Sequence, residues 1–100
     1  WELAYMQYLD IDDSVLTYSY EPFHIEYVSN IKSGKIRKYF PDLLVIKSDL
    51  VELIEIKPSN KLSKLVVRKK IAAAEIYASA NNMKFTVITE IELKNLKLIK

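Results

Sequence analysis

The sequence contains no cysteine, one histidine and one glycine, and these absences exclude several kinds of site. Without cysteine the chain has neither disulfides nor thiolate metal ligands, and a reducing cytoplasm is the expected compartment. The lone His24 excludes a zinc site built from several histidines. No apolar run approaches the roughly 18 to 20 residues of a membrane span, and no signal peptide is recognisable. We therefore expect a soluble cytoplasmic protein.

Basic residues are absent from the first 30 positions, which nevertheless hold six acidic ones. All 15 Lys and Arg residues follow Asn30, so a net charge of +2 conceals an acidic N-terminal third and a basic remainder. A basic body fits a polyanionic partner. A solvated lysine surface with no partner is the alternative interpretation, and composition leaves it open.

Length and hydrophobic content indicate a single domain over residues 1–100. Half of the 100 residues are apolar, which is enough to bury one modest core. Because the chain begins at Trp1 and enters an apolar-periodic segment at once, we interpret it as an excerpt of a longer chain.

Hydrophobic periodicity predicts an α/β fold. The expected elements are a helix over 1–9, strands over 15–20, 23–28, 36–46 and 51–57, a helix over 61–80, a strand over 83–88 and a closing helix over 91–99. Gly34 lies in the turn at 30–34, where a positive φ is expected. Thr89 is the expected N-cap of the last helix.

The expected strands 36–46 and 51–57 bring acidic residues together. If they form an antiparallel hairpin centred between residues 48 and 49, Asp42 stands opposite Glu55, with Cβ atoms about 5 Å apart. Lys57, two residues after Glu55, lies on the same face. Facing carboxylates repel, so a compensating charge is expected there.

A hard divalent cation would supply that charge. Mg²⁺, for which Mn²⁺ can substitute, is commonly held by one or two carboxylates together with water and phosphate oxygens. Asp42, Glu55 and the backbone carbonyl of Ile56 are the predicted ligands. Lys57 would orient a water molecule and stabilise phosphoryl oxygens.

The run Pro41-Asp42, followed after twelve residues by Glu55-Ile56-Lys57, resembles the PD-(D/E)XK nuclease signature. The acid and the Glu-x-Lys fall on adjacent expected strands with a long helix after them, as in the restriction-endonuclease-like fold. The resemblance implies a mixed central sheet flanked by helices, and a metal-dependent endonuclease that hydrolyses DNA phosphodiesters. Asp42, Glu55 and Lys57 would be its catalytic residues.

Nearly the whole chain resembles the N-terminal catalytic domain of TnsA-type transposon endonucleases. The similarity lies in Tyr18 to Pro22, in Glu26-Tyr27, in the runs at 38–45 and 55–59, and in the Val-Ile-Thr-Glu at 87–90. It implies that Glu2, on the first helix, joins the catalytic and metal site. It also implies cleavage at transposon ends beside a DDE transposase and an ATPase regulator, a possible homo- or hetero-oligomer, and a winged-helix domain following this one.

Basic residues flank the expected site on both sides. Lys35, Arg37 and Lys38 precede the catalytic strand and Lys61, Lys64 and Arg68 follow it, so we predict that all six contact DNA phosphates, with the protein then associated with the nucleoid. His24 has no partner in the sequence and is interpreted as a surface or partly buried histidine, not a catalytic one. A related PD-(D/E)XK nuclease, such as a Holliday-junction resolvase or a phage-type enzyme, and a non-cleaving DNA-binding or assembly module stay open as alternatives.

Overall fold

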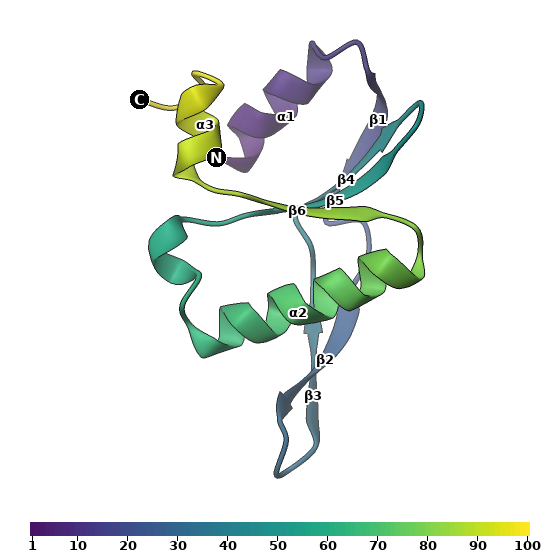
Figure 1. Ribbon diagram of the computed structural model, residues 1–100, viewed down its shortest axis with the longest axis vertical. Helices are drawn as coiled ribbons and strands as arrows, with labels where there is room; N and C mark the ends of the chain where they lie inside the picture. The colour runs from purple at the N-terminus through teal and green to yellow at the C-terminus, as the bar shows by residue number, and fades with distance from the viewer.

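A computed structural model describes residues 1–100 (Figure 1). The helices are α1 (Glu2–Asp10), α2 (Leu65–Ala80) and α3 (Glu90–Asn95), with a 3-10 turn, η1 (Ser59–Lys61), before α2. The strands are β1 (Val15–Tyr20), β2 (Ile25–Asn30), β3 (Lys35–Tyr39), β4 (Leu43–Lys47), β5 (Val51–Ile56) and β6 (Lys84–Ile88). The α/β class expected from periodicity is therefore confirmed.

Four strands form the central sheet, in the order β1-β4-β5-β6. The pairs β1–β4 and β4–β5 are antiparallel while β5–β6 is parallel, so the sheet is mixed, as expected. The parallel pair is possible because α2 supplies the crossover between β5 and β6. A second, two-stranded sheet joins β2 to β3. This hairpin, residues 25–39, extends from the body along the long axis of the molecule (Figure 1) and is called the arm below.

The prediction of one strand over 36–46 was wrong. The chain leaves the arm at Tyr39, passes through Phe40, Pro41 and Asp42 without strand structure, and enters the central sheet at Leu43. Pro41 has no N–H to donate to a ladder and restricts the residue before it, so a strand interior is a poor place for it. The two halves of the expected strand thus belong to different sheets.

Three other predicted boundaries also moved. The closing helix expected over 91–99 forms at Glu90–Asn95, because the chain leaves helical geometry after Leu96 and Lys97 has φ +60°. The strand expected at 23–28 forms at Ile25–Asn30, since Pro22 and its neighbours stay outside the ladder. The helix expected from residue 61 begins at Leu65, because the chain first makes η1 and Lys64 has an extended ψ of 135°. From there the alanine-rich sequence sustains 16 residues of helix.

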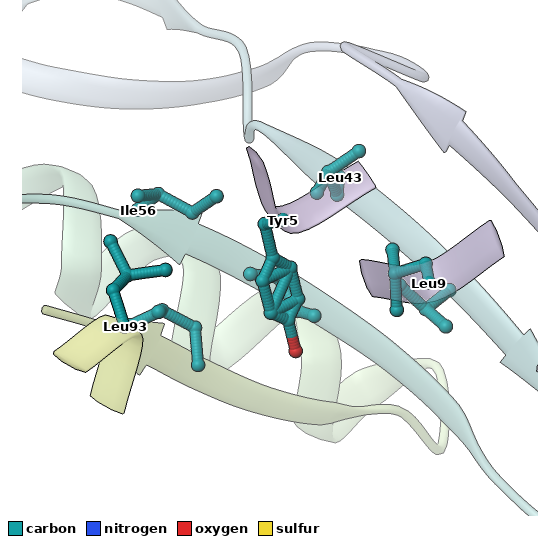
Figure 2. Close-up of a cluster of buried hydrophobic side chains, with 8 residues drawn as sticks. Tyr5, Leu9, Leu43, Ile56 and Leu93 are labelled. Atoms are coloured by element: carbon teal, nitrogen blue, oxygen red, sulfur yellow. The ribbon is translucent and has the colours of Figure 1, made fainter. Parts of the chain in front are cut away.

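Helices cover both faces of the central sheet (Figure 1). On one face α1 and α3 pack Tyr5, Leu9 and Leu93 against Leu43 and Ile56 of the sheet (Figure 2). On the other face α2 and the arm form a second cluster, made of Ile25, Tyr27, Tyr39, Leu53 and Ala74. Because β5 is covered on both sides, its sequence is a nearly continuous apolar run, and Glu52 and Glu55 are its only charged members.

Two local signals, the glycine of the arm turn and the N-cap of α3, behave as the sequence predicted. Gly34 has φ +68° in the turn of the arm. The Thr89 side chain accepts a hydrogen bond from the Ile91 N–H and so caps α3. No helix is both long and apolar enough to cross a membrane.

Candidate active site

The β4–β5 hairpin has the predicted register. Leu44 pairs with Leu53 and Leu43 with Ile54, so the next position outward sets Asp42 opposite Glu55. Asp42 stands just outside β4, and its Oδ2 accepts a hydrogen bond of 2.6 Å from the Ile56 N–H. This bond ties the carboxylate of Asp42 to the end of β5, within one residue of Glu55 and of Lys57.

Glu55 is buried, with 5% of its surface exposed, and its two carboxylate oxygens have different partners. The Oε1 atom accepts a 2.6 Å hydrogen bond from the hydroxyl of Tyr39, while Oε2 lies 3.7 Å from Nζ of Lys57. A buried carboxylate needs such partners because desolvation strongly disfavours an isolated charge. Glu55 and Lys57 share a face of β5, as the two-residue spacing predicted.

The carboxyl of Asp42 is electrostatically perturbed. Burial is the largest cause and raises its pKa from 3.8 to about 7, against the lowering effect of the Ile56 hydrogen bond. The negative charges of Glu55 and Glu2 raise the pKa further, while Lys57 lowers it. Repulsion between Asp42 and Glu55, which follows from their facing positions, thus contributes to the raised pKa of Asp42, although desolvation contributes more.

Glu2 approaches the site from α1. It lines a hollow of about 330 Å³ at the end of β5, together with Trp1, Ile56, Lys57, Pro58 and Lys61. Its carboxylate is partly exposed and lies 3.7 Å from the Trp1 amino group. Glu2 is thus near enough to act on the pKa of Asp42, and it faces the same hollow as Lys57 and the predicted DNA contact Lys61.

The donor set suits a hydrated magnesium ion. No group of three or more acidic, histidine or cysteine side chains has the arrangement of a metal site, so Glu2 does not complete a cluster with Asp42 and Glu55. Mg²⁺ in proteins usually keeps several waters and takes only one or two carboxylates, with phosphate oxygens filling other positions. Asp42 Oδ1 and Glu55 Oε2 have no hydrogen bond from the protein and are the oxygens that fit this role.

The six predicted DNA contacts fall in three places. Lys35, Arg37 and Lys38 line a groove of about 790 Å³ between the arm and α2, which we call the basic groove. Its other lining residues are Tyr27, Ser29, Asn30, Val66 and Lys70. Lys61 borders the hollow beside Glu2, whereas Lys64 and Arg68 are exposed. Lys64 precedes Val66 by two residues, and Arg68 precedes Lys70 by two residues. Two residues correspond to about half a turn of an α-helix, so Lys64 and Arg68 point away from the basic groove that Val66 and Lys70 line.

Sequence reasoning missed Tyr39 and Lys70. With 36–46 taken as one strand, alternation sends Tyr39 to the face opposite Asp42; the break at Pro41 instead lets both approach Glu55. Lys70, which lines the basic groove, has its Nζ 5.9 Å from the centre of the Tyr39 ring, and the hydroxyl of that ring bonds Glu55. The break at Pro41 was the only sequence signal for the position of Tyr39, and no local pattern indicated the position of Lys70.

His24 is exposed, as expected, and its ring lies near that of Phe40.

A mixed sheet flanked by helices, with an acid facing a Glu-x-Lys strand across a hairpin, defines a restriction-endonuclease-like fold of the PD-(D/E)XK class. The family described as TnsA-like endonuclease N terminal matches residues 12–90, and the chain belongs to that family. Asp42, Glu55 and Lys57 lie inside the matched range and Glu2 lies before it. No curated protein matches the chain.

Proposed function

We propose that this domain is a metal-dependent endodeoxyribonuclease that cleaves DNA phosphodiesters at transposon ends. The observation that carries the proposal is the convergence at one end of the sheet, where Asp42 is bonded to Ile56 and Glu55 lies 3.7 Å from Lys57. Membership in an endonuclease family supports it. Two carboxylates beside an ammonium group suit phosphodiester hydrolysis, and Lys57 also lines a hollow with Glu2.

Each residue has a distinct chemical role in this proposal. Asp42 and Glu55 offer one oxygen each to Mg²⁺ or Mn²⁺, and the Ile56 carbonyl is a further candidate ligand. The bound cation supplies a Lewis acid that neutralises phosphate charge and activates water. Lys57 donates hydrogen bonds from Nζ to the attacking water and to a phosphoryl oxygen, where negative charge grows. Glu2, which lines the same hollow as Lys57, would join Asp42 and Glu55 in holding the cation.

The rest of the substrate is bound by positive charge. Water attacks phosphorus and gives up a proton to solvent, the bond from phosphorus to the leaving deoxyribose oxygen breaks, and that oxygen takes up a proton from solvent. The adjoining phosphates run along the basic groove, whose charged members are all cationic: Lys35, Arg37, Lys38 and Lys70. No base-reading element is apparent among them, so we propose that the choice of site comes from partners, a DDE transposase and an ATPase regulator.

The experiment that tests this function is a plasmid nicking assay with Mg²⁺, with Mn²⁺ and with a chelator. The unaltered protein should nick supercoiled DNA only with a cation. Asp42→Ala, Glu55→Ala and Lys57→Ala should each reduce nicking by about 100-fold or more, because a catalytic unit fails when any member is removed.

Asp49→Ala is the matched control, since it removes an exposed acid from the turn of the same hairpin. It should nick like the parent. Nicking by any of the three site variants at near-parent rates would overturn the assignment. A parent that binds DNA but never nicks it would identify the domain as a non-cleaving binding module.

A further inference from the structure

Tyr39 makes a contact that the proposed hydrolysis does not use. It is the last residue of β3, only 4% of its surface is exposed, and its hydroxyl donates a 2.6 Å hydrogen bond to Oε1 of Glu55. This side-chain bond joins the arm to the central catalytic strand. Both partners are buried, so water does not compete for the carboxylate.

The bond makes the two oxygens of Glu55 unequal. Oε1 is occupied by Tyr39, while Oε2 faces Lys57 at 3.7 Å and has no hydrogen bond from the protein. Hydrogen bonds to a carboxylate are short and strong, and they fix the rotamer of the side chain that accepts them. Glu55 is thereby held in one orientation, and Oε2 is its oxygen without a hydrogen bond from the protein.

That restriction bears on which cation the site accepts. Mg²⁺ demands near-ideal octahedral geometry with short bonds, which single carboxylate oxygens and waters provide. Ca²⁺ takes 6–8 oxygens at longer distances and readily accepts both oxygens of one carboxylate. A glutamate whose Oε1 already accepts the Tyr39 hydroxyl offers Oε2 more readily than both oxygens together, which favours the first ion over the second.

We propose that Tyr39 is a positioning residue that confines Glu55 to one metal-binding oxygen and so selects Mg²⁺ over Ca²⁺. The inference rests on the proposed function, because it takes Glu55 as a metal ligand. It also gives the arm a role at the catalytic centre, because Tyr39 belongs to the arm and contacts Lys70, a residue of the basic groove, through its ring. The position of the arm therefore sets the orientation of Glu55.

Tyr39→Phe tests this directly, since it keeps the buried ring and removes only the hydroxyl. The apparent affinities for Mg²⁺ and for Ca²⁺ are measured separately from the rise in melting temperature with cation concentration. We expect the variant to bind Mg²⁺ about 10-fold more weakly, the usual effect of losing a partner that orients a ligand, and to bind Ca²⁺ as well as the parent or better. Mg²⁺-supported nicking should fall, with Mn²⁺ restoring part of it.

Two comparisons separate positioning from simple damage. Tyr5→Phe removes the hydroxyl of another buried tyrosine, one that packs in the opposite core, and should leave both affinities unchanged. In a Glu55→Gln background, adding Tyr39→Phe should change Mg²⁺ affinity no further, because the hydroxyl acts through the carboxylate.

The possible outcomes are distinct. Equal weakening of Mg²⁺ and Ca²⁺ binding, unchanged binding of both, or a full effect of Tyr39→Phe on top of Glu55→Gln overturns the role of Tyr39 and leaves the nuclease proposal intact. A parent whose melting temperature responds to no cation, and which nicks no DNA, overturns the nuclease proposal and this inference together.

Discussion

The ionisation of Asp42 links the candidate site to the free energy of unfolding of the protein. Its carboxyl is partly buried beside two other acids, and its pKa is raised from 3.8 to about 7. A raised pKa means that the folded protein disfavours the charged form of this acid relative to the unfolded chain. In the absence of a cation, ionisation of Asp42 therefore lowers the free energy of unfolding.

The pH dependence of the metal-free protein follows from that shift. Below about pH 4 Asp42 is protonated in both states, so it contributes nothing to the pH dependence of stability. Between about pH 4 and 7 the folded state keeps a proton that the unfolded chain has lost, and the contribution of Asp42 to stability falls as pH rises. Asp42→Asn should abolish this fall, raising stability at pH 8 by about 1 kcal/mol after allowance for solvent screening. Urea denaturation of both proteins at pH 5 and pH 8, with a chelator present, measures the difference.

The comparison between the two proteins isolates Asp42 from other acids, since Asp12 and Glu90 have lowered pKa values and act in the opposite direction. Asparagine keeps an oxygen that can accept the Ile56 N–H bond. Mg²⁺ or Mn²⁺ should raise the melting temperature of the parent and have little effect on the variant. If the variant is less stable at pH 8 and still responds to Mn²⁺ as the parent does, Asp42 is a structural residue.

At the scale of elements, the arm and α2 together determine where nucleic acid can lie. Residues on the inner side of the arm and on one side of α2 converge on the basic groove, with Arg37 and Lys70 contributed by different elements. Lys64 and Arg68 lie on the other side of α2, about half a helical turn away. The two pairs carry equal charge, which makes them suitable for comparison.

Arg37→Ala combined with Lys70→Ala should weaken DNA binding for all sequences and reduce the slope of log K against log salt by about 2, as two lost phosphate contacts do. Lys64→Ala combined with Arg68→Ala should also weaken binding, but less, because these residues lie farther from the groove. Fluorescence anisotropy of a labelled duplex over a range of KCl concentrations measures both slopes. A parental slope in the first double variant would mean that DNA passes elsewhere on the surface.

At the scale of the whole molecule, stability depends on the packing of α1 and α3 against the central sheet. Leu93 is fully buried in that cluster, whereas Ile91 on the same helix is 61% exposed (Figure 2). Leu93→Ala should lower the free energy of unfolding by about 2 to 5 kcal/mol, since it removes packing and leaves a cavity. Ile91→Ala should cost less than about 1 kcal/mol. Urea denaturation distinguishes the two, and equal losses would contradict the placement of α3.

The sequence by itself determined the register of the β4–β5 hairpin. A short turn between two apolar segments fixes register, and the two-residue period of a strand then places Asp42 opposite Glu55 and Lys57 beside it. The capped helix after Thr89, the positive φ of Gly34 and the mixed α/β architecture were also predictable. Each of these features depends either on residues that are close together in the sequence or on a hydrophobic period that is specific to a helix or to a strand.

Only the tertiary structure decided how the rest of the chain meets that hairpin. The sequence of the segment before Pro41 favours a strand but does not show which strand it pairs with. In the structure this segment, β3, pairs with β2 in the arm and not with a strand of the central sheet. The burial that perturbs Asp42, the bond from Tyr39 to Glu55 and the convergence of Lys70 with Arg37 all join parts of the chain that are far apart in sequence. Such contacts are set by how the layers pack, and packing of layers is a property of the whole molecule that no local pattern encodes.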